Sequence, residues 1–195
     1  ECGAGLRRMR VLRVICDTRI PCVSYRGGPS VSSIAIPVAV TGVGEAHVLD
    51  CTSLTSITIP DGVTSIGDEA FYRCTSLTSI TIPDSVTSIG NEAFYNCTSL
   101  TSITIPDGVT SIGSFAFCYC TSLTSITIPD SVTSIGNNAF EECTSLASIT
   151  FQGGAPTVGS EAFLGVADGA VALMTIENQA SFGASGNDWN GLTLK

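Results

Sequence analysis

The chain has 195 residues, of which 17 are acidic and 8 are basic, so its net charge is −9. This balance argues against a general nucleic-acid binder, which needs a basic surface to neutralise phosphates. Only 13% of the residues are charged and 44% are hydrophobic, which argues against a disordered chain. No apolar run approaches the roughly 20 residues of a membrane-spanning helix.

Residues 1–27 are predicted to form a basic N-terminal cap or flank. Six arginines against Glu1 and Asp17 give residues 1–26 a net charge of +4, and contact with an anionic partner is the alternative role. Because the chain begins with Glu1 and shows no secretory signal, we expect a processed chain or a fragment. The segment contains Arg7, Arg8, Arg10, Arg13, Arg19 and Arg26, and three cysteines whose pairing the sequence leaves open, Cys2, Cys16 and Cys22.

A 23-residue repeat organises most of the chain. The segment CTSLTSITIPDGVTSIGDEAFYR at 51–73 recurs with a constant period on both sides. Such a period indicates a solenoid, in which each copy stacks on its neighbours and the end copies need caps. We predict six repeats over residues 28–165 and a C-terminal cap over 166–195. The copies are residues 28–50, 51–73, 74–96, 97–119, 120–142 and 143–165.

Each copy begins with a predicted β-strand. Leu54, Ile57 and Ile59 form an LxxLxL pattern in which polar residues alternate with the isoleucines, as is typical of a strand with one buried face. Pro60 suits the strand end because proline donates no ladder hydrogen bond. The strands are predicted near residues 32–36, 55–59, 78–82, 101–105, 124–128 and 147–151.

The rest of each copy is predicted to lead back to the next strand. Asp61 and the residue after it are typical of a turn, and Val63 and Ile66 are expected to face inward across from the strand. Residues 68–74 are predicted to form one or two helical turns with Phe71 inward.

The pattern LxxIxIPxxVxxIGxxAFxxC resembles the BspA-like, or Treponema-type, leucine-rich repeat over residues 28–165. The motifs Ala162-Phe163 and Trp189-Asn190-Gly191-Leu192 are similar to the closing region of such proteins. The resemblance implies a β-rich α/β fold: a right-handed leucine-rich-repeat solenoid with a parallel sheet and one strand per 23-residue repeat. It also implies a surface or secreted protein of a host-associated bacterium or a protist, with a role in adhesion.

Two sets of repeated side chains are predicted to form structural ladders inside the solenoid. The repeated cysteines have neither CxxC spacing nor histidine partners, so we expect buried, unpaired thiols and no zinc site. Cys118 stands where Tyr72 and Tyr95 stand, so it is expected to be exposed. The ladder residues are Cys51, Cys74, Cys97, Cys120 and Cys143, and Phe71, Phe94, Phe117, Phe140 and Phe163.

No residue pattern predicts catalysis, a metal or a cofactor. His47 is the sole histidine and is expected to have a packing or cap role. A row of aspartates is expected to serve the turns, because one carboxylate per copy falls short of the 6–8 oxygens that Ca²⁺ prefers; a string of weak Ca²⁺ sites is the alternative. The row is Asp61, Asp84, Asp107 and Asp130.

Hydroxyl side chains are predicted to cover the exposed, concave face of the sheet. They would be spaced about 6.8 Å along a strand and about 4.8 Å between strands. Copies 51–142 carry no aromatic or arginine anchors on this face, which favours weak, repeated contacts. The residues are Ser56, Thr58, Ser79, Thr81, Ser102, Thr104, Ser125, Thr127, Ser148 and Thr150.

These features favour a non-enzymatic binding or adhesion module that presents this face to a protein or glycan. The resemblance places the partner on a host or neighbouring cell, and the protein outside the cell or on its surface. The alternative is a structural or water-ordering solenoid, similar to ice-binding proteins, without a specific macromolecular partner. The sequence predicts no oligomeric state.

Overall fold

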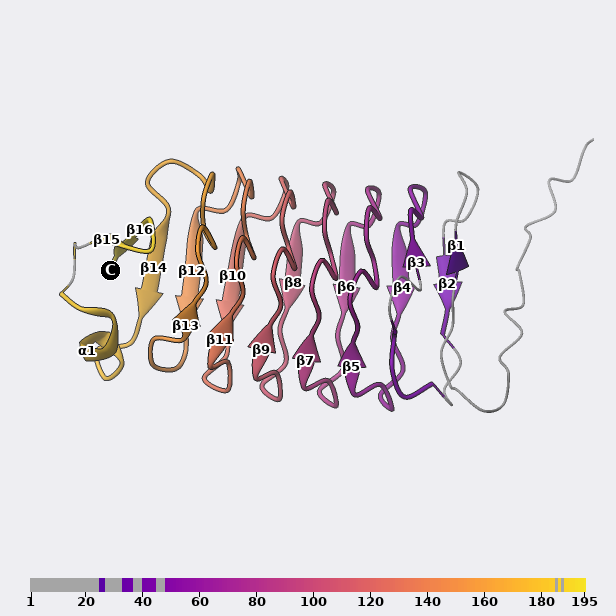
Figure 1. Cartoon of the computed structure of the whole chain (residues 1–195), viewed down its shortest axis with the longest axis horizontal. Helices are drawn as coiled ribbons and strands as arrows, with labels where there is room; N and C mark the ends of the chain where they lie inside the picture. Colours follow the sequence, from indigo (N-terminus) through magenta and orange to yellow (C-terminus); the bar gives the residue numbers. More distant parts are fainter. Residues whose placement is uncertain (1–24, 27–32, 37–39, 45–47, 185, 187) are drawn as a thin grey trace, which may run out of the picture.

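The computed structural model describes residues 25–26, 33–36, 40–44, 48–184, 186 and 188–195. These residues form a parallel β-solenoid in which each 23-residue copy makes one rung (Figure 1). From β4 (Ser56–Thr58) to β14 (Val171–Met174) the rungs follow one another along a nearly straight line in this view. The concavity expected of the strand face is therefore not evident in Figure 1.

The first row of strands runs along the whole solenoid. The strands of this row before residue 105 and those after residue 124 belong to two sheets, and within each sheet neighbouring strands of the row pair in parallel, so that Ser79 lies opposite Ser102 and Ile80 opposite Ile103. The six strands predicted from the LxxLxL pattern are confirmed. The row contains β2 (Ser33–Ala35), β4, β6 (Ser79–Thr81), β8 (Ser102–Thr104), β10 (Ser125–Ile128), β12 (Ser148–Phe151), β14 and β16 (Leu192–Leu194).

A second row of short parallel strands follows the turn after Pro60. The Val63 N–H donates to the Pro60 carbonyl over 3.1 Å, which closes this turn. Val63 and Ile66 are buried, as expected. Each of copies 51–165 thus carries the one predicted strand in the first row, and the inward-facing stretch across from it forms a second, short strand. The second row contains β5 (Ser65–Ile66), β7 (Ser88–Ile89), β9 (Ser111–Ile112), β11 (Ser134–Ile135) and β13 (Thr157–Val158).

The third row, which we call the turn row, consists of residues 68–73 and their equivalents, and here the predicted helical turns are wrong. The Phe71 N–H donates to the Ala93 carbonyl of the next rung over 2.7 Å, and the Arg73 N–H donates to Tyr95 over 2.8 Å. Left-handed backbone at Glu69 (φ 54°) and Arg73 (φ 57°) separates the short turns. An α-helix would direct these N–H groups to carbonyls four residues back, so it is incompatible with the bonds between rungs. In the first rungs this row forms the parallel pair β1 (Tyr25–Arg26) and β3 (Val48–Leu49).

The core consists of side chains that stack on their equivalents in neighbouring rungs. The rings of Phe71, Phe94 and Phe117 lie parallel, with 5.2 Å between successive centroids. Glycine at the corner before the turn row allows this close stacking, because a Cβ on Gly113 would lie 2.5 Å from the carbonyl carbon of Gly90. The corner glycines are therefore required by the contact between rungs.

The described residues of the segment 166–195 cover the C-terminal end of the core. Strand β14 continues the first row in the same phase, with Val171 opposite Ser148. Within the described residues, the one helix is α1 (Gln179–Phe182), and β15 (Asp188–Trp189) pairs antiparallel with β16. Phe182 and Trp189 pack on Phe151, with centroid distances of 5.1 and 5.3 Å.

Phe94→Ala and Thr81→Ala test the assignment of inside and outside. Phe94 is fully buried between two stacked rings, so its replacement should lower the free energy of unfolding by about 3–5 kcal/mol. Thr81 is exposed, so its replacement should change this value by less than about 0.5 kcal/mol. Denaturant unfolding measures both values, and equal losses would contradict the assignment.

Candidate binding surfaces

The strand face is the outward side of the first row, and it carries the ten predicted hydroxyl residues. In copies 51–142 these side chains are exposed on either side of a buried isoleucine, whereas Ser148 and Thr150 are half-buried. Thr81 lies opposite Thr58 and Thr104, so equivalent hydroxyls form lines along the solenoid. Within the described residues, none of the ten hydroxyl groups hydrogen-bonds to another protein group. They are available to solvent or to a ligand.

The threonines before the second row differ in this respect. The Thr87 hydroxyl donates to the Thr64 carbonyl over 3.2 Å, and Thr110 donates to Thr87 over 3.3 Å. Thr133 continues this line by donating to Thr110 over 3.2 Å. Because these hydroxyl protons serve the contact between rungs, the strand face offers the more accessible polar lattice.

An aromatic cluster on the turn row was missed by the sequence analysis. Tyr72 and Tyr95 stack with centroids 4.9 Å apart, and Tyr119 meets Tyr95 edge-on at 5.7 Å. The Arg73 guanidinium lies 5.4 Å from the centre of the Tyr72 ring, and Phe115 is half-buried in the same row. We call Tyr72, Arg73, Tyr95 and Tyr119 the turn-face cluster.

Carboxylates surround the turn-face cluster. Partial burial, with the charges of Glu69 and Asp68, raises the pKa of Glu92. Glu141 in the following rung accepts a hydrogen bond from Asn138 over 3.0 Å. The turn row from residue 68 to residue 142 is therefore rich in negative charge, and Arg73 is the basic residue in that part of the row.

The repeated cysteines stabilise the contact between rungs. The Cys97 thiol donates to the Phe71 carbonyl over 3.3 Å, and the Cys120 thiol donates to Phe94 over 3.2 Å. Burial raises the pKa of Cys97 to about 12 and also raises that of Cys120. These neutral, inward thiols are poor nucleophiles and poor metal ligands. All five repeated cysteines are buried, and the free thiols among them are Cys74, Cys97, Cys120 and Cys143.

The expectation of an exposed Cys118 is wrong, because its residue is only 1% exposed. A cysteine side chain is shorter than the tyrosine ring at the equivalent position, so it stays below the surface. Its thiol lies 3.6 Å from a Glu141 carboxylate oxygen, to which it donates. Burial, with the charge of Glu141, raises the pKa of Cys118 to about 12.

The remaining candidates do not assemble into a site in the described residues. The aspartates Asp61, Asp84, Asp107 and Asp130 are exposed in the turns, which a backbone bond closes. Within the described ranges, no three His, Cys, Asp or Glu side chains gather as metal ligands would. His47, Cys2, Cys16, Cys22 and the arginines from Arg7 to Arg19 lie outside the described residues.

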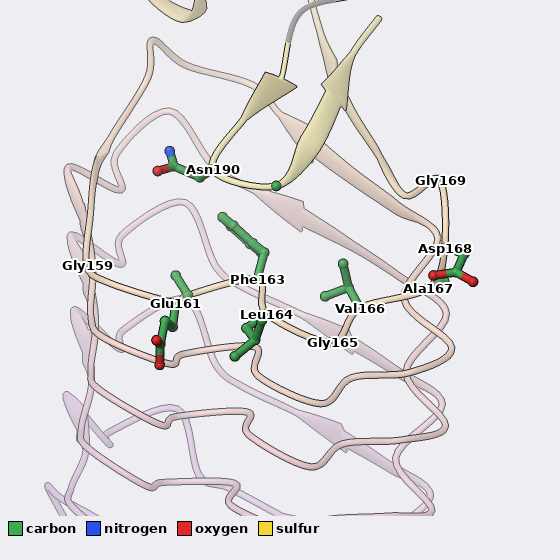
Figure 2. Close-up of a pocket in the computed structure, with 12 residues that line it drawn as sticks. Gly159, Glu161, Phe163, Leu164, Gly165, Val166, Ala167, Asp168, Gly169 and Asn190 are labelled. Carbon is green, nitrogen blue, oxygen red and sulfur yellow. The ribbon is translucent and has the colours of Figure 1, made fainter.

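A cavity of about 390 Å³ lies where the turn row ends, beneath the tip of the β15–β16 hairpin (Figure 2). Phe163 and Val166 point toward the tip at Asn190. The Phe140 N–H donates to the Ala162 carbonyl, but the equivalent N–H of Phe163 has no acceptor among the described residues. The lining contains no nucleophile paired with a base, so the cavity has no recognisable catalytic constellation.

The fold and its exposed surfaces define a leucine-rich-repeat solenoid. A model of the BspA type leucine rich repeat region matches residues 18–123 and 64–179. The chain therefore belongs to the BspA-type leucine-rich repeat family, whose members are generally interaction modules. No curated protein sequence matches the chain. No helix among the described residues has the length and apolarity needed to cross a bilayer.

Solved structures of bacterial leucine-rich repeat proteins resemble the chain. The T. pallidum leucine-rich repeat protein TpLRR is 30% identical, with a TM-score of 0.63, over 69% of this chain and 76% of that protein. A leucine-rich cell surface protein from Faecalibacterium prausnitzii is 33% identical, with a TM-score of 0.57, over 83% of this chain. The match spans about half, 52%, of that protein. The pneumococcal vaccine antigen PcpA shares the fold, with 15% identity and a TM-score of 0.54 over 93% of this chain and 40% of that protein.

The cysteine ladder predicts inert thiols. Because the thiols of Cys74, Cys97, Cys120 and Cys143 are buried and neutral, maleimide should label them in the native protein far more slowly than after unfolding. Mass spectrometry of the labelled peptides measures each site. A reductant should leave the melting temperature almost unchanged, whereas a loss of about 2–4 kcal/mol in stability would indicate a disulfide instead.

Proposed function

We propose that the chain is a non-enzymatic binding module that contacts protein or glycan partners through the strand face. The observation that carries this proposal is the in-register lattice of exposed hydroxyls, which have no protein partner in the described residues. Each rung offers nearly the same polar surface, so a partner meets a repeated site. Each weak contact raises the effective concentration for the next one, so the contacts together give avidity without a deep pocket.

An adhesion role at the cell surface is part of this proposal. The F. prausnitzii relative is described as a cell surface protein, and it is 33% identical to this chain. A long solenoid suits this role, because it exposes one continuous face to a partner. The partner proposed is a protein or glycan of a host or neighbouring cell.

A water-ordering solenoid is the second candidate, and the straightness of the array favours it. Between β4 and β14 the rungs follow a nearly straight line in Figure 1, so the strand face does not bend away from a flat surface in this view. Regularly spaced hydroxyls on such a face can order water. The two candidates make different predictions: a binding module retains a protein or glycan partner, whereas a water-ordering solenoid does not.

The combined variant Thr81→Val, Thr104→Val and Thr127→Val tests the strand face. Valine keeps the volume and the strand preference but removes the hydroxyl, so retention on immobilised glycans and matrix proteins should fall at least tenfold. The matched control is Thr87→Val, Thr110→Val and Thr133→Val beside the second row, which should keep retention. Equal retention by both variants contradicts the proposal. Thermal hysteresis of the parent without retention supports the water-ordering candidate.

Deletion of residues 74–119 tests the repeated surface. It removes two whole rungs and preserves the 23-residue phase, so the chain should keep its circular-dichroism spectrum and lose most of its avidity for a multivalent ligand. The deletion also removes Tyr95 and Tyr119. The double variant Tyr95→Ala with Tyr119→Ala in the full chain is therefore the control for the loss of these tyrosines. If the shortened chain binds as tightly as the parent, the site lies elsewhere.

A further inference from the structure

Sequence differences among the four most similar copies concentrate on the turn row. Copies 51–73, 74–96, 97–119 and 120–142 differ at the positions of Asp68, Glu69, Tyr72 and Arg73, and otherwise only in an alternation of glycine and serine after the turn aspartate. The strand face is therefore the same in every one of these rungs. A partner that recognises one particular rung among these four must therefore contact the turn row.

The side chains at these variable positions form an anchor of the kind that specific interfaces use. The turn-face cluster spans three successive rungs and combines three tyrosines and an arginine, and both residue types are enriched at binding hot spots. Tyr119 is 40% exposed, which is high for a large side chain in this solenoid. In the next rung, Glu141 and Glu142 replace the aromatic residues, so the cluster has a defined end.

The charge around the cluster selects a cationic ligand. Glu69 and Glu92 each stand three residues before a tyrosine, Tyr72 or Tyr95. Glu141 and Glu142 are in the rung that follows Tyr119. Partial burial, together with repulsion from Glu69 and Asp68, raises the pKa of Glu92, and a nearby positive charge would relieve this repulsion. Arg73 over the Tyr72 ring shows within this chain how a guanidinium sits on such an aromatic surface.

We propose that the turn-face cluster is a recognition site for an arginine-containing peptide segment of a partner protein. A guanidinium group of the partner stacks on the exposed ring of Tyr119, which Tyr95 supports from the preceding rung. Glu92, Glu141 and Glu142 neutralise its charge. Arginine is preferred to lysine, because a planar guanidinium both stacks on a ring and binds a carboxylate with two hydrogen bonds. This site is separate from the strand face, so the failure of one proposal leaves the other standing.

Titration of the full chain with a defined peptide tests the site. The probe is a blocked peptide of four alternating arginine and serine residues, compared with the lysine and glutamate versions by calorimetry at low and high salt. We expect the arginine peptide to bind most tightly, the glutamate peptide not to bind, and binding to weaken with salt. Tyr119→Ala and Tyr95→Ala should each weaken binding three- to fivefold, and Glu92→Gln should weaken it similarly.

Matched variants distinguish loss of specific peptide recognition from loss of folding and from unspecific attraction of a cationic peptide to an acidic protein. Tyr119→Phe keeps the ring and should keep the affinity, whereas Tyr119→Leu removes it and should weaken binding three- to fivefold, as Tyr119→Ala does, at an unchanged melting temperature. Thr104→Ala on the strand face is the control and should bind like the parent. The proposal is overturned if the peptide does not bind at millimolar concentration, if the tyrosine variants bind as tightly as the parent, or if lysine and arginine peptides bind equally.

Discussion

Backbone hydrogen bonds between neighbouring rungs are the constraint on which the rest of the structure depends. They occur in all three rows: Thr78 donates to Thr55 in the first, Thr87 to Thr64 in the second, and Phe71 to Ala93 in the turn row. A rung that gained or lost one residue would shift the partners of every later bond, and in a strand it would also turn inward side chains outward. The constant 23-residue period is thus a requirement of hydrogen bonding at three places in each turn.

This constraint brings each side chain next to its equivalent in the adjacent rung. Stacked phenylalanines and buried thiols are favourable there, because the rings stack with centroids 5.2 Å apart. The Cys97 and Cys120 thiols also donate to the Phe71 and Phe94 carbonyls. The same alignment on the outside produces lines of hydroxyls on the strand face. Packing and the candidate binding lattice therefore have one common cause, and neither depends on a pocket.

The turn row has a freedom that the other rows lack. Its backbone makes the bonds between rungs, while the side chains at the positions of Glu69, Tyr72 and Arg73 point away from the core and are exposed or half-buried. Substitution there disturbs little of the stacking, so these positions can differ between copies without changing the fold. Aromatic and charged side chains can gather on this row for that reason.

The sequence by itself determined the solenoid, the first-row strands and the inward ladders of Phe94 and Cys97, because a fixed period and alternating apolar residues directly express which side chains are buried. It did not determine the turn row. There the segment predicted to be helical forms no helix, because its N–H groups donate to carbonyls of the next rung. Nor did it place Cys118 below the surface or show that Tyr95 and Tyr119 meet, although they are 24 residues apart in sequence. These features depend on contacts between copies, and only the stacking of the tertiary structure decides them.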